Sequence, residues 1–218
     1  MSNDVSIKKL ILVPSLITLG VTLLRLVGEL MNWSPVLFNK AAGGGGAIIG
    51  IAWLVLVFGA IFGWKLAQAG QGPASAGKAI GLAFLGFAMG PLALVLTRLM
   101  GLGPQSTTAF GVIIVMGIVG AVIAYYGWPG LGKVLFAYAL AARIPVVIVM
   151  LVAMLGNWGT HYDVAPPNFP AMGTIQKWFM IGVVPQLTIW IWFTIAVGAL
   201  MGGIAAALKG SGTRAIAA

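Results

Sequence analysis

The sequence predicts an all-α, polytopic membrane protein: a single domain over residues 1–218, built as a bundle of about six transmembrane helices. Two observations lead to this fold class. Hydrophobic residues make up 61% of the chain and charged residues only 7%, whereas about 25% of the residues in a soluble domain are charged. Several continuous apolar runs also reach the length of about 20 residues that spans a bilayer. A transmembrane barrel would instead show segments of about ten residues with alternating polarity.

The apolar runs place the expected spans at 9–31, 46–67, 79–101, 108–127, 132–155 and 180–208. The first is expected to be a retained helix, because it is too long for the apolar core of a signal peptide and lacks a small-residue cleavage site. The second follows the run from Gly43 to Gly46, which loosens the connection and lets backbones approach each other. The third follows a flexible loop of small residues, QAGQGPASAG.

Turn signals separate the remaining spans. The tetrapeptide GWPG at 127–130 predicts a tight turn between the fourth and fifth spans. The longest connection, residues 156–179, contains three prolines that keep its backbone extended or turning. Trp158 and Trp178 bracket this connection, as expected for rings that settle at the level of the lipid headgroups.

Glycines four residues apart, at 86/90 and 198/202, predict close helix–helix packing. The chain contains 32 glycines, so some pairs at this spacing are expected from composition alone. We therefore interpret the pairs as ordinary packing within the bundle.

Basic residues in the connections predict that both termini lie in the cytoplasm, because cytoplasmic loops carry an excess of Lys and Arg. The net charge of +9 is then explained by topology and by contact with anionic membrane lipids. No basic stripe with interleaved aromatic residues indicates nucleic-acid binding. We expect an integral protein of the bacterial inner (plasma) membrane. The expected cytoplasmic set is Lys8, Lys9, Lys65, Lys78, Lys133, Lys209 and Arg214, and the opposite set is Lys40, Lys177 and Arg98.

Three arginines, Arg25, Arg98 and Arg143, lie inside apolar segments. A guanidinium stays protonated, and placing it in hydrocarbon costs roughly 2.5–3.5 kcal/mol on insertion scales. Each arginine therefore needs a partner, a water path or a ligand. Arg25 and Glu29 share a helix face and are expected to pair, either as a salt bridge that reaches toward the interface or as a proton or cation site. Arg98 is close enough to the end of its span to act as an interfacial anchor.

Arg143 is the arginine that most strongly suggests a function, because it lies roughly 15 Å from either end of its span. No carboxylate lies in its own segment. Pro145 has no N–H, so the carbonyl of Ala141 loses its usual helical partner. Gln186 in the last span is a candidate hydrogen-bond partner for Arg143, or else polar glue between helices. The other candidate partners are Glu29, a carbonyl, water or an anionic ligand.

Prolines inside three spans add to this pattern, since transporters build polar sites from broken helices, although proline is also common in passive membrane helices. The combination favours a small transporter or channel-like protein that binds an anionic or polar solute. Six helices are few for a transporter, so a homo-oligomer is expected. The prolines are Pro91, Pro145 and Pro185, and the expected ligand-binding residues are Arg143, Arg25, Glu29, Arg98 and Gln186.

The alternative is a non-catalytic subunit, or a lipid- or cofactor-binding scaffold, of a larger membrane complex. Its arginines would then hold lipid headgroups, a quinone or a cofactor of another membrane subunit. A third alternative is an intramembrane enzyme acting through Glu29, His161 or Asp163. No nucleophile stands at a recognisable spacing from these residues, so we expect no catalytic residue and no enzyme.

Cofactors and metals leave no signature in the sequence. The chain has no cysteine and a single histidine, whereas a zinc site needs three or four ligands. No metal site is therefore expected, and the residues identify no cofactor.

Overall fold

The computed structural model describes residues 5–44, 48–103, 106–167 and 169–216, which contain helices and no strand. Five helical segments in this part of the chain are long and apolar enough to cross a membrane, which confirms the all-α class. The elements are α1 (Ile7–Leu30), η1 (Ala42–Gly44), α2 (Leu54–Gln68), α3 (Ala76–Leu99), α4 (Thr107–Gly127), α5 (Pro129–Gly156), α6 (Thr174–Lys177), η2 (Trp178–Val183), α7 (Val184–Leu187) and α8 (Ile189–Ile216).

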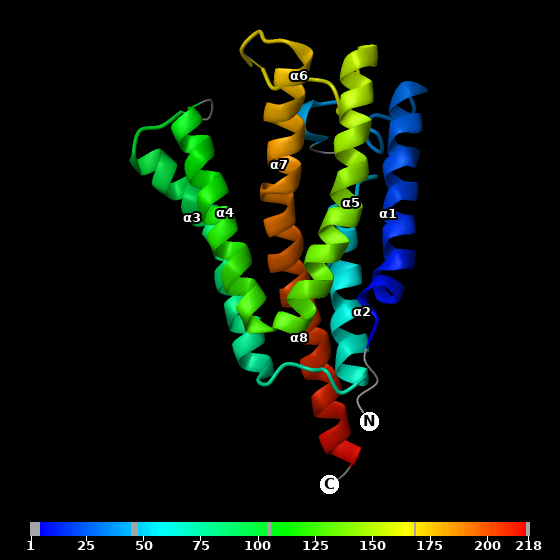
Figure 1. Ribbon diagram of the computed structural model, residues 1–218, viewed down its shortest axis with the longest axis vertical. Helices are drawn as coiled ribbons and strands as arrows, with labels where there is room; N and C mark the ends of the chain where they lie inside the picture. The colour runs from blue at the N-terminus through cyan, green and yellow to red at the C-terminus, as the bar shows by residue number, and fades with distance from the viewer. Residues whose placement is uncertain (1–4, 45–47, 104–105, 168, 217–218) are drawn as a thin grey trace.

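The helices run up and down to form one bundle (Figure 1). The α3–α4 hairpin forms one flank and α1 forms the other, and α5 crosses obliquely between them. Elements α6, η2, α7 and α8 make one long column beside α5. The beginning of α1 and the end of α8 lie at the same end of the bundle, and the long connections lie at the opposite end, which is called the loop end below.

Local signals in the sequence set the helix boundaries. Side chains of Ser6, Ser75 and Ser106 accept backbone N–H groups in the first turns of α1, α3 and α4, as N-cap residues do. Helix α5 begins at Pro129, a position where the missing N–H costs nothing. It ends at Gly156, and the next residue, Asn157, has the left-handed conformation common after a helix (φ 49°).

Many large apolar side chains point outward from the bundle. Val13 on α1, Phe84 on α3 and Val115 on α4 are each about 60% exposed (60%, 62% and 59%). A protein in water rarely shows extensive apolar patches, whereas helices facing lipid do. These outward faces and the lengths of the helices indicate a membrane protein.

The second expected span, 46–67, is wrong at its beginning. Helix α2 has only 15 residues and begins at Leu54, and the described residues 48–53 form bends and turns. The backbone N–H groups of Ile48 and Ile49 donate to the carbonyls of Val36 and Leu37 (3.2 and 3.1 Å). This apolar stretch thus folds back on the preceding loop and satisfies its polar backbone there.

The last expected span, 180–208, begins earlier than predicted, at Thr174. Six residues of π-helix, Trp178–Val183, precede Pro185, and the N–H of Val184 donates to the carbonyl of Phe179, five residues back. Pro185 cannot donate to the usual carbonyl, so the helix widens by one residue before it. A second irregularity follows at Thr188, whose φ and ψ are −122° and −73°.

Glycines bring helix backbones into direct contact, as their spacing predicts. A Cβ added at Gly63 of α2 would lie 2.3 Å from the carbonyl oxygen of Gly202 in α8, and one added at Gly86 of α3 would lie 2.4 Å from that of Gly120 in α4. The ring of Trp192 packs against the same α3–α4 contact, and its Nε1–H donates to the Gly86 carbonyl (2.8 Å). These contacts hold α2 and the α3–α4 hairpin against α8.

Candidate functional site

A partly open cavity of about 320 Å³ lies toward the loop end of the bundle. Its walls come from α1, from the connection between α1 and α2, from α5, from the loop after α5 and from the α7–α8 region. Three of the five expected ligand-binding residues, Arg25, Arg143 and Gln186, line this one cavity. The structure thus brings together side chains that lie far apart in the sequence.

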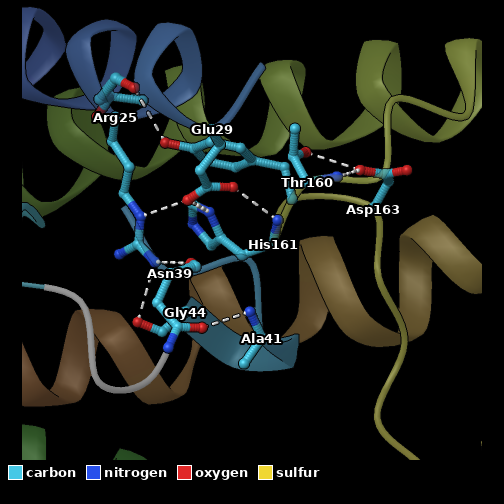
Figure 2. Close-up of polar contacts among 10 residues, drawn as sticks. Arg25, Glu29, Asn39, Ala41, Gly44, Thr160, His161 and Asp163 are labelled. Atoms are coloured by element: carbon cyan, nitrogen blue, oxygen red, sulfur yellow. Dashed lines mark hydrogen bonds and ion pairs between the residues drawn. The ribbon is translucent and has the colours of Figure 1, made fainter. Parts of the chain in front are cut away.

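Arg25 and Glu29 form the expected pair on α1, and they are buried rather than directed to the interface. Arg25 Nε donates to Glu29 Oε1 at 2.8 Å, and the exposed fractions of the two side chains are 8% and 0%. Arg25 Nη2 also donates to the carbonyls of Asn39 and Gly44 (3.0 and 3.1 Å; Figure 2). The connection between α1 and α2 covers this pair, so its arginine does not snorkel.

His161 is the partner of Glu29 that sequence reasoning missed. Its backbone N–H donates to Glu29 Oε2 (2.8 Å), and its ring Nδ1 lies 2.5 Å from Glu29 Oε1 (Figure 2). A carboxylate only accepts hydrogen bonds, so Nδ1 carries a proton in this arrangement. Burial lowers the pKa of His161, and the Arg25 charge acts in the same direction against the opposing effects of Glu29 and Asp163. A neutral ring that donates from Nδ1 is consistent with both observations.

Asp163 folds the loop that presents His161. Its carboxylate accepts the backbone N–H groups of Gly159 and Thr160 (2.9 and 2.7 Å) and the Thr160 hydroxyl (2.7 Å). The hydroxyl of the neighbouring Tyr162 donates to the carbonyl of Thr22 on α1 (3.0 Å), and burial raises the pKa of this phenol. Asp163 therefore has a structural role in a turn that is fastened to α1.

Arg143 is buried in the middle of α5, with an exposed fraction of 4%. Its Nη1 donates to Gln186 Oε1 at 3.3 Å, and its Cζ lies 4.5 Å from the centre of the Trp190 ring. The Nε of Arg143 is buried and has no hydrogen-bond partner. The carboxylates of Glu29 and Asp163, the two acidic side chains in the described ranges, are bonded elsewhere. Arg143 therefore has polar and aromatic contacts but no counter-charge among the described residues.

The irregular last span positions both of these contacts. Gln186 directly follows Pro185, and Trp190 lies four residues later, beyond the irregular Thr188. Thr188 itself does not reach Arg143, because its hydroxyl donates to the carbonyl of Val184 (2.6 Å). The Nε1–H of Trp178 donates to the carbonyl of Val147 on α5 (2.9 Å). This bond fixes the π-helical segment against the helix that carries Arg143.

Arg98 does not belong to this cavity. It is an exposed residue in the last turn of α3, on the α3–α4 flank of the bundle. Its neighbours Val95 and Leu99 are also exposed (52% and 79%). This position agrees with an interfacial anchor and makes Arg98 a suitable control for experiments on Arg143.

The cavity carries a net positive charge. Arg25 is neutralised by Glu29, and His161 in its neutral form adds none, so the charge of Arg143 is left over. An unmatched charge in a low-dielectric interior is costly. Binding an anion would remove that cost, so the arrangement is suited chemically to an anionic ligand.

The fold and this cavity define a bundle of helices that are long and apolar enough to cross a membrane, with a partly open cationic pocket. No protein-family model, curated protein or solved structure matches the chain. Among the described residues, no group of three or more His, Cys, Asp or Glu side chains could hold a metal ion.

Proposed function

We propose that this protein is a small transporter or channel-like protein that binds an anionic or polar solute in the cavity beside Arg143. One observation carries the proposal: an arginine that is 4% exposed lines a cavity, and its Nε has no partner. A charge at membrane depth that serves only packing would be expected to have a counter-ion.

The broken backbone around the cavity supports the same proposal. Transporters commonly build sites from discontinuous helices near the bilayer midplane, and π-helical turns are frequent at functional sites. Here a π-helical segment and an irregular Thr188 flank Gln186. The non-helical stretch that includes Gly50 and Ile51 forms another wall, as is tolerated where backbone lines a cavity.

The clamp formed by Arg25, Glu29 and His161 is proposed to act as the cover of the cavity. It ties two connections at the loop end to the same point on α1. Arg25 and His161 also line the cavity themselves. A solute that enters from this end would pass beside the clamp before it reached Arg143.

The membrane, the orientation and the oligomeric state of the protein are also part of the proposal. We propose that the protein lies in a bacterial inner membrane with both termini in the cytoplasm, because the basic residues at the ends of its helices favour that orientation. The loop end and the cavity would then face the exterior. A homo-oligomer is proposed for the assembled protein, with membrane lipids at its apolar surface.

Flux through reconstituted vesicles tests this function. Purified protein is placed in liposomes, and light scattering follows their swelling in isosmotic potassium chloride, potassium methanesulfonate or glycerol. In the two potassium salts, valinomycin carries the cation. We expect faster swelling with the wild-type protein than with empty liposomes for at least one solute. Arg143→Gln should lower that rate at least tenfold, and Arg98→Gln should leave it unchanged. Equal rates for wild type and Arg143→Gln would refute a transport role for Arg143.

The alternative, a lipid- or cofactor-binding scaffold, is favoured by a different observation. Val146, Met150 and Ile51 give the cavity an apolar wall suited to an acyl chain or a ring. A scaffold would show no flux with any of the solutes. It would instead retain a lipid, a cofactor or a foreign subunit through purification, and Arg143→Gln would release it.

A further inference from the structure

The guanidinium of Arg143 presents one free edge. Nη1 is bonded to Gln186 (3.3 Å) and one face of the group is covered by Trp190. Nε has no partner, and Nη2, which lies on the same edge as Nε, has no hydrogen bond within the described ranges. Two parallel N–H groups on one edge match the two oxygens of a carboxylate or a phosphate. The contacts that are made thus leave unpaired the edge that would match a two-oxygen head.

The charges around this edge favour a ligand with a single negative charge. The pair of Arg25 and Glu29 is neutral as a unit. Arg143 contributes one positive charge that no described carboxylate matches. A monovalent head would neutralise it, whereas a divalent ligand would leave one negative charge buried without a partner, which is costly in a low-dielectric interior.

The size and walls of the cavity favour a ligand with an apolar body. Its volume of about 320 Å³ is far larger than a single small ion, and it lies at the lower end of the range of roughly 300–1,000 Å³ found for small-molecule sites. The wall of the cavity that Arg143 lines includes Val146, Met150, Ile51 and Trp53. Burying an apolar group against these side chains is favourable, and burying a hydrated ion is not.

We propose that Arg143 binds the two-oxygen head of a monovalent anion whose apolar body lies against Val146, Met150 and Trp53. The chemical class is an apolar monocarboxylate or a monoanionic phosphodiester, taken either from solution or from a lipid. This ligand class rests on the anion-binding function proposed above and narrows it.

Binding of three related aromatic probes tests the class without measuring transport. The protein is placed in phosphatidylcholine nanodiscs and titrated by calorimetry with benzoate, with its neutral analogue benzamide and with divalent phthalate. We expect wild type and Arg98→Gln to bind benzoate at least tenfold more tightly than either other probe. Arg143→Gln should weaken benzoate binding at least tenfold. Arg143→Lys keeps the charge but loses the two-donor edge, so it should also bind more weakly than wild type.

Each outcome bears on the proposal. Equal binding of benzamide and benzoate, or tighter binding of phthalate, would overturn the monovalent class. Full benzoate affinity in Arg143→Lys would overturn the role of the two-donor edge, and this variant retains the cation if Arg143→Gln fails to fold. If benzoate does not bind but Arg143-dependent swelling is seen, the ligand class is wrong and the transport function stands. If neither is seen, both are wrong.

Native mass spectrometry distinguishes the two sources of the ligand. Wild type and Arg143→Gln are purified from membranes that contain phosphatidylglycerol, a monoanionic phosphodiester. One retained phosphatidylglycerol in wild type, absent from Arg143→Gln and displaced by benzoate, would support a lipid as the source. No retained lipid, together with benzoate binding, would support a solute. A retained lipid that is insensitive to both the variant and benzoate lies elsewhere and counts against a lipid source.

Discussion

His161 contacts both carboxylate oxygens of Glu29, which lies 132 positions earlier in the chain. The backbone N–H of His161 donates to Oε2, and its ring Nδ1 is hydrogen-bonded to Oε1. The same Oε1 also accepts from Arg25 Nε. The one acidic residue described within an expected span thus joins α1 to the loop after α5. Through Arg25 it also reaches the connection before α2, so both connections depend on one side chain.

Removing one member of the Arg25–Glu29 pair should destabilise the protein more than removing both. Glu29→Gln leaves a buried guanidinium without its counter-charge, a change that typically costs 3–5 kcal/mol, and we expect a loss of about that size. The double variant Arg25→Gln/Glu29→Gln should lose less stability than Glu29→Gln alone. Unfolding of all four proteins in detergent micelles measures the coupling, and strictly additive losses would show that the pair does not interact.

The lowered pKa of His161 predicts a loss of stability in mild acid. The ordinary pKa of histidine is about 6.5, and burial holds that of His161 below it in the folded protein. Between the two values the unfolded chain binds more protons, so stability rises with pH in that interval. The stability that neutral His161 contributes is complete above about pH 6.5, and it is lost as the pH falls through the pKa that His161 has in the folded protein.

Thermal unfolding between pH 5 and pH 8 checks this prediction. The titratable groups around the ring are Arg25, Glu29, Asp163 and Tyr162, and a His161→Gln variant retains all four. The unfolding temperature of the wild type should decrease as the pH is lowered below about 6.5. The decrease per pH unit should be smaller in His161→Gln. Identical slopes would mean that another group causes the pH dependence.

A methyl group at Gly63 should separate α2 from α8. The added Cβ would lie 2.3–2.4 Å from the backbone oxygen and Cα of Gly202, and backbone atoms cannot rotate away. Gly63→Ala should cost 1–3 kcal/mol or more, as overpacking does. Gly81→Ala on α3 is the matched control, because its Cβ would meet nothing within 4 Å. That variant should be neutral or more stable by up to about 1 kcal/mol, because alanine favours helix. A similar loss of stability in both variants would show that the backbone contact is not the cause.

Gln186→Glu should abolish anion binding without unfolding the protein. Gln186 Oε1 already lies 3.3 Å from Arg143 Nη1, so a carboxylate at this position would supply the missing counter-charge. Benzoate affinity should fall at least tenfold, while the thermal midpoint stays the same or rises. Gln176→Glu, on the exposed side of α6, introduces the same charge outside the cavity and should leave binding unchanged. Retained benzoate binding in Gln186→Glu would show that benzoate binding does not depend on the unmatched charge of Arg143.

Local patterns in the sequence predicted most of the fold. Long apolar runs located five of the spans to within a few residues, apart from the earlier beginning of the last one at Thr174. The pairing of Arg25 with Glu29 was also predictable, because residues four apart on a helix face each other. The beginning of α2 was not, since apolarity alone does not reveal that a glycine-rich stretch folds back on a loop. The π-helical turn before Pro185 likewise depends on tertiary packing.

The bond between Arg143 and Gln186 was predicted from the sequence, but the contact between His161 and Glu29 was not. His161 and Glu29 are separated by 132 positions, and no periodicity links them. A signal did exist: with six spans and both termini on one side, the end of the first span, which carries Glu29, and the 156–179 connection, which carries the single histidine, are expected on the same side of the membrane. Trp190 was overlooked as a partner of Arg143, although it lies four residues after Gln186, where a helical turn places the two side chains on one face.

The shortness of α2 affects the voltage that a bound anion would experience. Its 15 residues cover about 22 Å, less than the roughly 30 Å of a hydrocarbon core. The irregular backbone before α2 lines the cavity and would occupy the remaining depth, so polar groups would extend inward from the loop end. The electric field would then be concentrated between Arg143 and the opposite surface. For a transported anion, binding from the loop end would be nearly insensitive to voltage. Release to the other side would carry most of the roughly 2.3 kcal/mol per charge that 100 mV supplies.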